Sequence, residues 1–476
     1  MSALLQKGKL PRGWTRIRMG EVGRWFGGGT PSKANPRFWT GGNIPWVSPK
    51  DMKSALITDA QDHITEDAVA QSATNLVEAG SILIVVRSGI LQHTLPVAVV
   101  QRQVALNQDL KAVKPRENIR SDYLALALKA FERDILHTCT KTGTTVQSLE
   151  LPVFLRFEIP VAPLPEQRRI VAEIEKQFTR LEAGVAALRR VQANLKRYRA
   201  AVLKAACEGR LVPTEAELNK SGSGVPPLGL GKKRQDAAST FETGEALLAR
   251  ILTERRQNWQ GRGQYKEPAA PDTADLPSLP EGWAWSTADQ FTSVITDGEH
   301  ITPERSDSGI LLLSARNVLD GRIALEDVDY VPQREYDRIA KRLVVVPGDV
   351  LLSCSGSVGR SAVVPEGLLF TLVRSVAVLK PLAAMGKYLS IALRSPLLKR
   401  QITSKQTQTA QANIFQGKIK VLCVPLPPIT EQTRIVAEVE RRLSVVEELE
   451  MVVSANLQRA TRLRQAILQK AFTGKL

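Results

Sequence analysis

The residues of this sequence that most often carry catalytic or metal chemistry lie far apart along the chain. Four histidines and four cysteines are present, and neither set shows the short spacings with which metal ligands recur. They are His63, His93, His137 and His300, with Cys139, Cys207, Cys354 and Cys423. We therefore expect no metal site, reduced thiols, and histidines that are surface or satisfied core residues.

Two short motifs come close to known catalytic signatures but fail the tests for them. FGGGTPSK (26–33) lacks the GxxxxGK[ST] spacing of a nucleotide-binding loop and runs into Pro36. We interpret it as a structural turn, or alternatively as a loop whose amides and Lys33 approach a DNA phosphate. NPRFW (35–39) begins like the NPP[YF] motif of amino-methyltransferases but lacks its second proline. With no GxSxG and no dinucleotide-binding GxGxxG, the sequence favours a chain that binds and does not catalyse.

The charge of the chain points to a polyanionic partner. There are 65 lysines and arginines against 48 acidic residues, which gives a net charge of +17. The excess is spread over the chain, with 20 basic and 14 acidic residues in 1–160 and 17 and 14 in 279–428. A basic surface on folded domains fits nucleic acid, and the alternative is a basic surface that binds nothing.

No segment of the sequence indicates a membrane or an export signal. No apolar run approaches the ~18 residues needed to span a bilayer. The first residues, MSALLQKGKLPRGW, lack an apolar signal core. We expect a soluble, cytoplasmic protein.

The elements that would position a binding surface are repeated. EQRRIVAEIE (166–175) appears again as EQTRIVAEVE (431–440). At similar offsets YLALAL (123–128) matches YLSIAL (388–393), and LPRGW (10–14) matches LPEGW (279–283). A period this long indicates two copies of one domain of about 200 residues, since solenoid repeats are far shorter.

Each copy ends in an apolar pattern typical of a long helix. Between residues 168 and 208 there is no proline, and apolar residues recur every three or four positions. The stripe in the first copy is Ile170, Ile174, Phe178, Leu181, Val185, Leu188, Val191, Leu195, Tyr198 and Val202. In the second copy it is Ile435, Val439, Leu443, Val446, Leu449, Val453, Leu457, Ala460, Leu463 and Ile467. We predict that the two helices pair as an internal antiparallel coiled coil, against the alternative of two domain helices that never meet.

The rest of each copy is predicted to be short strands and loops with a few helices, so the fold class is α+β. SILIVV (81–86), LVVV (343–346) and VLLS (350–353) are expected as strands. Short helices are expected near 121–131 and 387–394. Residues 212–278 indicate a flexible linker containing one amphipathic helix on Leu247, Leu248, Ile251 and Leu252, which would pack on the coiled coil or on a partner subunit.

Together these residues resemble a known family. LPxGW opens each half, GGGTPS is followed by the aromatic-rich IPWVS, and PLPEQRRIVAEIE leads into a long helix. With the endings EGRLV and TGKL, the chain resembles the specificity subunit of type I restriction–modification systems over nearly its whole length. LPxGW alone is a weak motif, whereas the helix start combined with its ending is more specific.

The resemblance implies a division of labour. Each globular half would be a target recognition domain that reads one half of a split DNA site, and the paired helices would be a spacer. Two methyltransferase subunits using S-adenosylmethionine, and restriction subunits using ATP and Mg, would dock on the chain, which would itself hold no cofactor and be non-catalytic. An approximate two-fold axis would relate the two domains, which would meet DNA about one helical turn apart. Because loops 51–75 and 317–342 differ, an asymmetric, bipartite target is expected.

The expected boundaries follow the repeat. They are a first target recognition domain (1–160), a central spacer helix (161–211), a linker (212–278), a second target recognition domain (279–428) and a C-terminal spacer helix (429–476). The alternatives are a coiled-coil scaffold with basic adapter domains outside restriction–modification, and an enzyme acting alone, which no motif supports.

Candidate DNA contacts are polar and basic residues on the expected loops. In the first domain they are Thr30, Ser32, Lys33, Lys50, Arg87, Ser88, Thr144 and Gln147. In the second they are Arg305, Arg316, Asn317, Ser355, Ser357, Arg360, Arg374 and Gln411. Lys50 and Arg316 occupy matched places in the repeat, and Ser88 and Ser355 nearly so, which favours shared backbone contacts there. Each of these residues could instead be an ordinary solvated side chain.

Overall fold

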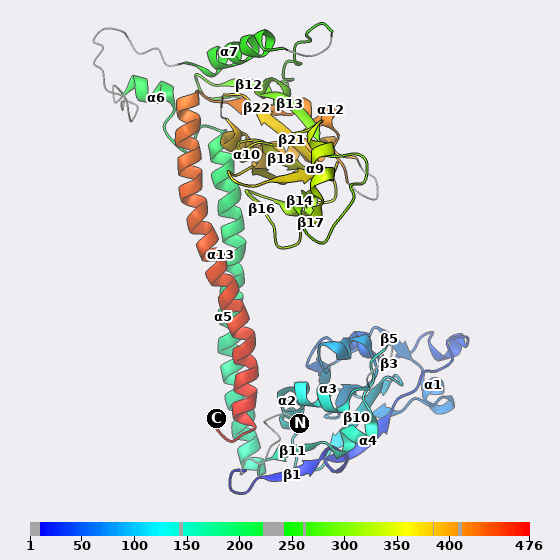
Figure 1. Ribbon diagram of the computed structural model, residues 1–476. Helices are drawn as coiled ribbons and strands as arrows, with labels where there is room; N and C mark the ends of the chain where they lie inside the picture. The colour runs from blue at the N-terminus through cyan, green and yellow to red at the C-terminus, as the bar shows by residue number, and fades with distance from the viewer. Residues whose placement is uncertain (1–9, 142–145, 222–241, 260–262, 384, 408–411) are drawn as a thin grey trace. The chain divides into compact units, whose positions relative to one another are not determined.

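The computed structural model describes residues 10–141, 146–221, 242–259, 263–383, 385–407 and 412–476. The chain divides into two compact units. Unit 1 comprises the chain up to Arg190 together with Val453–Leu476, and unit 2 comprises Val191–Val452 (Figure 1). Each unit therefore holds a globular part and a portion of both long helices, α5 (Leu164–Cys207) and α13 (Ile429–Ala471).

The globular part of unit 1 is built on three small sheets. The strand β7 (Ile82–Val85) pairs with a neighbour on each side, and all four of its side chains are buried. This double burial explains why the predicted strand SILIVV is apolar throughout instead of alternating. The largest sheet has the order β2 (Gly23–Gly27), β10 (Leu110–Pro115), β7, β8 (Val97–Val100), β4 (Leu56–Ile57). The others are β5 (Asp62–Ile64), β3 (Ile44–Val47), β9 (Val104–Leu106), β6 (Leu76–Val77), and the pair β1 (Thr15–Arg18), β11 (Glu158–Val161).

Helices complete unit 1. Tyr123 and Leu128 of α2 (Ser121–Ala130) are fully buried in the same core as β7 and β10. The remaining α-helices of the globular part are α1 (Glu66–Gln71), α3 (Glu132–Cys139) and α4 (Leu151–Arg156). Single 3-10 turns lie at η1 (Met19–Glu21), η2 (Pro36–Phe38), η3 (Pro49–Asp51) and η4 (Gly89–Gln92).

The globular part of unit 2 follows a similar plan. Its central strand β18 (Val350–Ser353) is buried at every position between two antiparallel neighbours. The main sheet has the order β13 (Thr292–Asp297), β21 (Val376–Pro381), β18, β19 (Ser361–Val363). The others are β17 (Asp329–Val331), β14 (Ile310–Leu313), β20 (Phe370–Leu372), then β15 (Val318–Leu319) with β16 (Arg322–Ile323), and β12 (Ala284–Thr287) with β22 (Cys423–Leu426). Its helices are α6 (Glu215–Lys220), α7 (Gly244–Gln257), α8 (Ala288–Phe291), α9 (Gln333–Ala340), α10 (Gly386–Arg394), α11 (Pro396–Lys405), α12 (Gln416–Lys420) and the 3-10 turn η5 (Ala315–Asn317).

A tryptophan–glutamate hydrogen bond ties each globular part to the start of its long helix. In unit 1 the indole Nε1 of Trp14 donates to Glu166 Oε2 over 3.0 Å. In unit 2 Trp283 Nε1 donates to Glu431 Oε1 over 3.0 Å. The tryptophan of LPxGW and the glutamate of the EQxxIVAE motif are therefore partners in both copies, which explains why the two motifs occur together.

A buried tyrosine supports the same junction in both units. Tyr123 donates its hydroxyl to the Pro160 carbonyl at 3.1 Å, and Tyr388 donates to the Pro425 carbonyl at 3.0 Å. These tyrosines are the ones that the repeat aligns. The predicted duplication is thus present in the hydrogen bonding as well as in the sequence.

The predicted long helices and the α+β class are confirmed. The two helices pack together, with the early turns of α5 against the late turns of α13 in unit 1. There Arg464 Nη1 lies 3.0 Å from Glu182 Oε1, and its guanidinium lies 4.2 Å above the ring of Phe178. In unit 2 the late turns of α5 meet the early turns of α13, and Arg199 Nη2 lies 3.0 Å from Glu450 Oε2.

The predicted apolar stripe is wrong at four positions. Most of its members are buried or half-buried, but four side chains on the two helices are exposed. These are Val191, Tyr198, Leu449 and Leu463. An imperfect seam leaves such residues outside the contact, because only side chains that meet a neighbouring helix are covered.

Two further expectations need correction, the strand at 343–346 and the wholly flexible linker after α5. LVVV (343–346) forms no strand; Val344 and Val346 are exposed, and the amide of Val346 donates to Asp349 Oδ2 at 2.9 Å in a turn that leads into β18. An apolar run becomes a strand only where a neighbouring strand is free to pair with it.

The expected amphipathic helix is present as α7, and its buried residues share one core cluster with residues of α5 and α13. Leu247 and Ile251 are buried in the core of unit 2, and α7 contacts α8 and β12. The preceding segment, expected as flexible linker, contains α6, whose Thr214 caps the helix in a reciprocal pair with Glu217. The intervening residues 222–241 lie outside the described part of the chain.

Candidate nucleic-acid interface

The glycine-rich motif of unit 1 is a closely packed turn. A Cβ placed on Gly28 would lie 1.9 Å from the carbonyl oxygen of Asn107, so only glycine fits there. The amide of Gly29 donates to the Leu106 carbonyl at 2.9 Å and is not available to a phosphate. The turn presents the next residues outward, and Thr30, Ser32 and Lys33 are all exposed.

Lys33 and Thr30 differ in how they are engaged. The Thr30 hydroxyl donates to the side-chain carbonyl of Gln108. No hydrogen bond or ion pair holds the Lys33 ammonium within the part of the chain that the structure describes. Lys33 is therefore free to meet a phosphate.

The matched residues Lys50 and Arg316 make the same ion pair in both units. Lys50 Nζ lies 2.8 Å from Asp62 Oδ2, and this hydrogen bond raises the pKa of Lys50. Arg316 Nη2 lies 3.0 Å from Asp329 Oδ1. Each pair joins a 3-10 turn, η3 or η5, to a strand further along the chain, β5 or β17. Both cations are partly exposed, so each can hold its turn and still offer hydrogen bonds to DNA.

Two other candidates of unit 2 lie nearby, Arg305 at the carboxylate of Asp329 and Asn317 in the turn η5. Arg305 Nη2 lies 3.5 Å from Asp329 Oδ2. Asn317 is only 2% exposed, and its amide donates to the carbonyls of Ala324 and Asp327 while its oxygen accepts from Ser314. The structure gives Asn317 a role in holding the turn that carries Arg316.

A second loop follows the central strand in unit 1. Arg87 and Ser88 follow β7 after Val86, and the Ser88 amide donates to the Gln147 carbonyl at 3.0 Å. Arg87 Nη1 lies 4.0 Å from Asp109 Oδ1 and is largely exposed. The structure therefore brings Arg87, Ser88 and Gln147 together. Thr144 lies outside the described residues.

In unit 2 the corresponding loop borders a hollow of about 550 Å³. Ser355 and Arg374, both candidates from the sequence, line it together with Phe415. The Ser355 hydroxyl donates to Asn413 Oδ1 at 2.5 Å. Ser357 is exposed on the same loop, and Arg360 follows it with its amide bonded to Ser353 Oγ. Gln411 lies outside the described residues.

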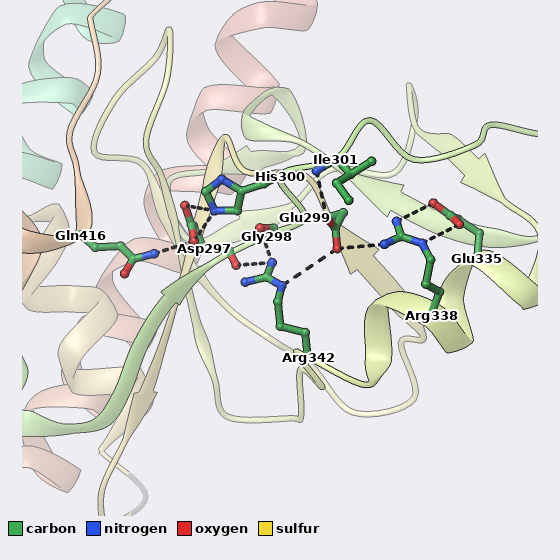
Figure 2. A network of polar contacts seen from close by, with 9 residues as sticks. All are labelled: Asp297, Gly298, Glu299, His300, Ile301, Glu335, Arg338, Arg342 and Gln416. Carbon is green, nitrogen blue, oxygen red and sulfur yellow. Dashed lines mark hydrogen bonds and ion pairs between the residues drawn. The ribbon is translucent and has the colours of Figure 1, made fainter. Parts of the chain in front are cut away.

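Three side chains that the sequence did not single out together form one wall of this hollow. Figure 2 shows His300 and Gln416 both directed at the carboxylate of Asp297. His300 Nε2 lies 3.1 Å from Asp297 Oδ1, and Gln416 Nε2 donates to the same oxygen at 2.5 Å. Asp297 ends β13 and Gln416 begins α12, so the carboxylate joins two elements and fixes the imidazole.

A buried glutamate next to this wall anchors the loop that carries His300. Glu299 is 7% exposed, and its Oε1 accepts from the amide of Ile301 at 2.9 Å. Its Oε2 lies 3.7 Å from Arg338 and 4.0 Å from Arg342 (Figure 2). Arg342 also donates to the carbonyl of Gly298. Several polar contacts thus hold the loop that carries His300, and His300 and Arg374 line the same hollow.

The sequence identified Arg374 and Ser355 as candidates by residue type, but it predicted His300 to be an ordinary surface or core residue. A lone histidine without ligand spacing carries no signal, and Asp297 and Gln416 are 119 positions apart. The only available clue was the position of DGEH at the place where GGGT stands in the first copy.

The described residues do not meet the requirements of a metal site, a membrane-spanning helix or a disulfide. Across the described ranges, no group of three or more His, Cys, Asp or Glu side chains is arranged to hold a metal ion. None of the helices in those ranges is both long and apolar enough to cross a bilayer. All four cysteines are buried and form no disulfide.

Known proteins resemble the chain in both halves. A profile described as "Type I restriction modification DNA specificity domain" matches residues 11–187 and 338–447, more than half of the chain. The EcoR124I/EcoR124II specificity subunit of Escherichia coli, a type I restriction enzyme component, is 48% identical over 158 residues, which are 33% of this chain and 39% of that protein. The EcoBI specificity subunit of Escherichia coli is 25% identical over 344 residues, 70% of this chain and 62% of that protein. The StySPI specificity subunit of Salmonella potsdam is 22% identical over 477 residues, 99% and 91% of the two chains.

The match spans 39% and 62% of the lengths of the first two relatives. A solved structure described as "Structural basis underlying complex assembly and conformational transition of the type I R-M system" is 21% identical, with a TM-score of 0.63, and covers 99% of this chain and 100% of the other. At that identity the similarity concerns the fold. The profile covers parts of both copies, and both copies share one architecture. The chain therefore belongs to the family of type I restriction–modification DNA specificity domains.

Proposed function

We propose that the chain is the DNA-recognition subunit of a type I restriction–modification complex and that it reads a bipartite DNA site. One observation carries the proposal: two units share a framework down to its hydrogen bonds, yet the residues exposed on their loops differ. A shared framework with different side chains is suited to reading two half-sites of different sequence. The net charge of +17 supplies the attraction to the phosphate backbone.

The domain boundaries belong to this proposal. Residues 1–160 and 279–428 serve as target recognition domains, and 161–211 and 429–476 as spacer helices. Residues 212–278 connect them, and α7 within this connection packs on the second domain.

The partners are proposed from the same family. The relatives bear the name of type I restriction enzyme specificity subunits, which implies methyltransferase and restriction subunits around them. In this chain's complex, two methyltransferase subunits would bring S-adenosylmethionine, and restriction subunits would use ATP and Mg. The chain itself supplies binding and positioning, in the cytoplasm where the DNA lies.

The test is to express the chain with and without the methyltransferase subunit encoded beside it. The pair should co-purify, and mapping of methylated adenines should show one bipartite sequence that is modified only when both are present. The purified chain alone should neither methylate nor cut DNA. If methylation occurs at the same sites without this chain, the proposed function is wrong, and the scaffold alternative gains support.

A further inference from the structure

The two units place their loop residues on one and the same backbone framework. Val86 directly follows the central strand β7 of unit 1, and its carbonyl accepts from the amide of Leu149 at 2.8 Å. Cys354 directly follows the central strand β18 of unit 2, and its carbonyl accepts from the amide of Ile414 at 3.0 Å. Leu149 therefore corresponds to Ile414, and the residues that follow them correspond as well.

The residue after each of these begins a helix. In unit 1 the Glu150 carbonyl accepts from the Val153 amide at 2.9 Å at the start of α4. In unit 2 the Phe415 carbonyl accepts from the Lys418 amide at 2.8 Å at the start of α12. Glu150 and Phe415 thus occupy one framework position with opposite chemistry.

A second pair of positions is defined by the turn after β2 and β13. The Gly29 amide donates to the Leu106 carbonyl at 2.9 Å, and the Glu299 amide donates to the Leu372 carbonyl at 2.7 Å. Two residues beyond these carbonyls stand Gln108 in unit 1 and Arg374 in unit 2. One residue beyond the two amides stand Thr30 and His300.

In unit 2 the two framework positions meet at one place. Arg374 and Phe415 line the same hollow of about 550 Å³. The ring of Phe415 is 65% exposed, although its backbone is fixed by the hydrogen bonds above. No hydrogen bond or ion pair engages the guanidinium of Arg374 anywhere in the described ranges. An exposed aromatic ring on a hydrogen-bonded backbone, beside a guanidinium without a partner in the described residues, offers one apolar and one hydrogen-bonding surface.

We propose that Arg374 and Phe415 determine the specificity of the half-site read by unit 2, and that Gln108 and Glu150 do so at the equivalent positions of unit 1. Arg374 donates to O6 and N7 of a guanine, and Phe415 contacts the methyl group of a neighbouring thymine. Gln108, which is held by Thr30, pairs with an adenine, and Glu150 accepts from a cytosine amino group. This assignment rests on the proposed function.

The test uses the full chain in complex with its methyltransferase subunit and reads the methylated sequences across a genome. Arg374→Ala should relax one position of one half-site, with preference for guanine there falling about 10-fold to 100-fold. Arg374→Gln should turn that preference toward adenine. Phe415→Ala should relax a neighbouring position of the same half-site, whereas Gln108→Ala should relax a position of the other.

Arg256→Ala serves as the matched control. Arg256 lies on α7, where it pairs with Glu267 and lines no part of the hollow. All variants should co-purify with the methyltransferase subunit as the wild type does, because the substituted side chains are exposed. If Arg374→Ala and Phe415→Ala leave the methylated sequence unchanged, or relax the half-site that Gln108→Ala relaxes, this assignment is wrong while the proposed function stands. A wild-type complex that methylates without sequence preference would overturn both.

Discussion

Lys33 and Lys50 show how two lysines of one domain differ in what they offer to DNA. Lys50 donates to Asp62, whereas the ammonium of Lys33 is free within the described residues. A free, exposed ammonium is suited to a phosphate contact, which adds affinity on every sequence. Under the proposed assignment, affinity for any sequence would come from Lys33, and discrimination between sequences would come from Arg374.

Lys33→Ala should weaken binding to specific and unrelated DNA by the same factor. The slope of log affinity against log salt should fall by about one, as expected for the loss of one phosphate contact. Titrations of the complex with both DNAs at several salt concentrations would measure it. Lys220→Ala is the control, since Lys220 is already paired with Glu281 at 2.6 Å. A loss confined to the specific DNA would contradict the phosphate role.

Glu431 makes the stability of unit 2 depend on pH. Burial raises the pKa of this carboxyl to about 7, although hydrogen bonds from the Glu215 amide and Trp283 oppose the shift. Because the folded state holds this proton more tightly than the unfolded state, the contribution to stability is present below pH 4.5 and is lost as the pH rises to about 7.

Glu431→Gln keeps the acceptor oxygen and removes the charge. Its free energy of unfolding relative to the wild type should therefore increase between pH 5 and pH 8, by on the order of 1–3 kcal/mol. Urea unfolding across that range would measure the difference, with the exposed Glu448→Gln as control. A difference that stays constant with pH would show that the Glu431 carboxyl does not titrate as described.

The long helices show which parts of a pattern a sequence can predict. Their existence, length and partner followed from apolar spacing and from the repeat. The exposure of Leu463 did not follow, because whether a position on the stripe is covered depends on the side chains of the facing helix. The same reasoning applies to LVVV, which pairs with no strand in the described part of the chain.

The seam between the helices gives a prediction at the level of one element. Ile174 of α5 is fully buried, whereas Leu463 of α13, also on the predicted stripe, is 48% exposed. Ile174→Ala should lower the free energy of unfolding of unit 1 by roughly 2–5 kcal/mol, because it leaves a cavity. Leu463→Ala should change it by less than about 0.5 kcal/mol. Thermal unfolding would compare the two, and equal losses would mean that the seam is not where the structure places it.

The sequence predicted only some of the residues that line the hollow of unit 2. Arg374 and Ser355 could be named because arginine and serine are common DNA contacts. Asp297, His300 and Phe415 could not, because their meaning comes from three segments that are brought together by β13, β20 and α12. Exposure of an aromatic ring is likewise a property of the fold, and no local pattern reveals it.

At the scale of the whole molecule, unit 1 depends on the end of the chain. Phe472 is buried in the core of unit 1, with its ring centroid 5.0 Å from that of Tyr123 and 6.4 Å from that of Phe131. Phe472→Ala should destabilise unit 1 by roughly 3–5 kcal/mol. Amide hydrogen exchange should become faster in β7 and β10 and stay unchanged in β18 and β21. The partly exposed Leu476→Ala is the control, and faster exchange in both units would contradict the division.

This dependence has a consequence for biosynthesis. Unit 2 is one continuous segment and can complete its core as soon as Val452 has left the ribosome. The sheets of unit 1 emerge first but must wait for Ile467, Leu468 and Phe472, since the 286 residues from Val191 to Leu476 follow its first portion. At roughly 5–20 residues per second that interval is about 15–60 s. During translation we therefore expect the globular part of unit 1 to expose the apolar surface that these residues later cover, and chaperones that bind apolar surfaces should recognise it.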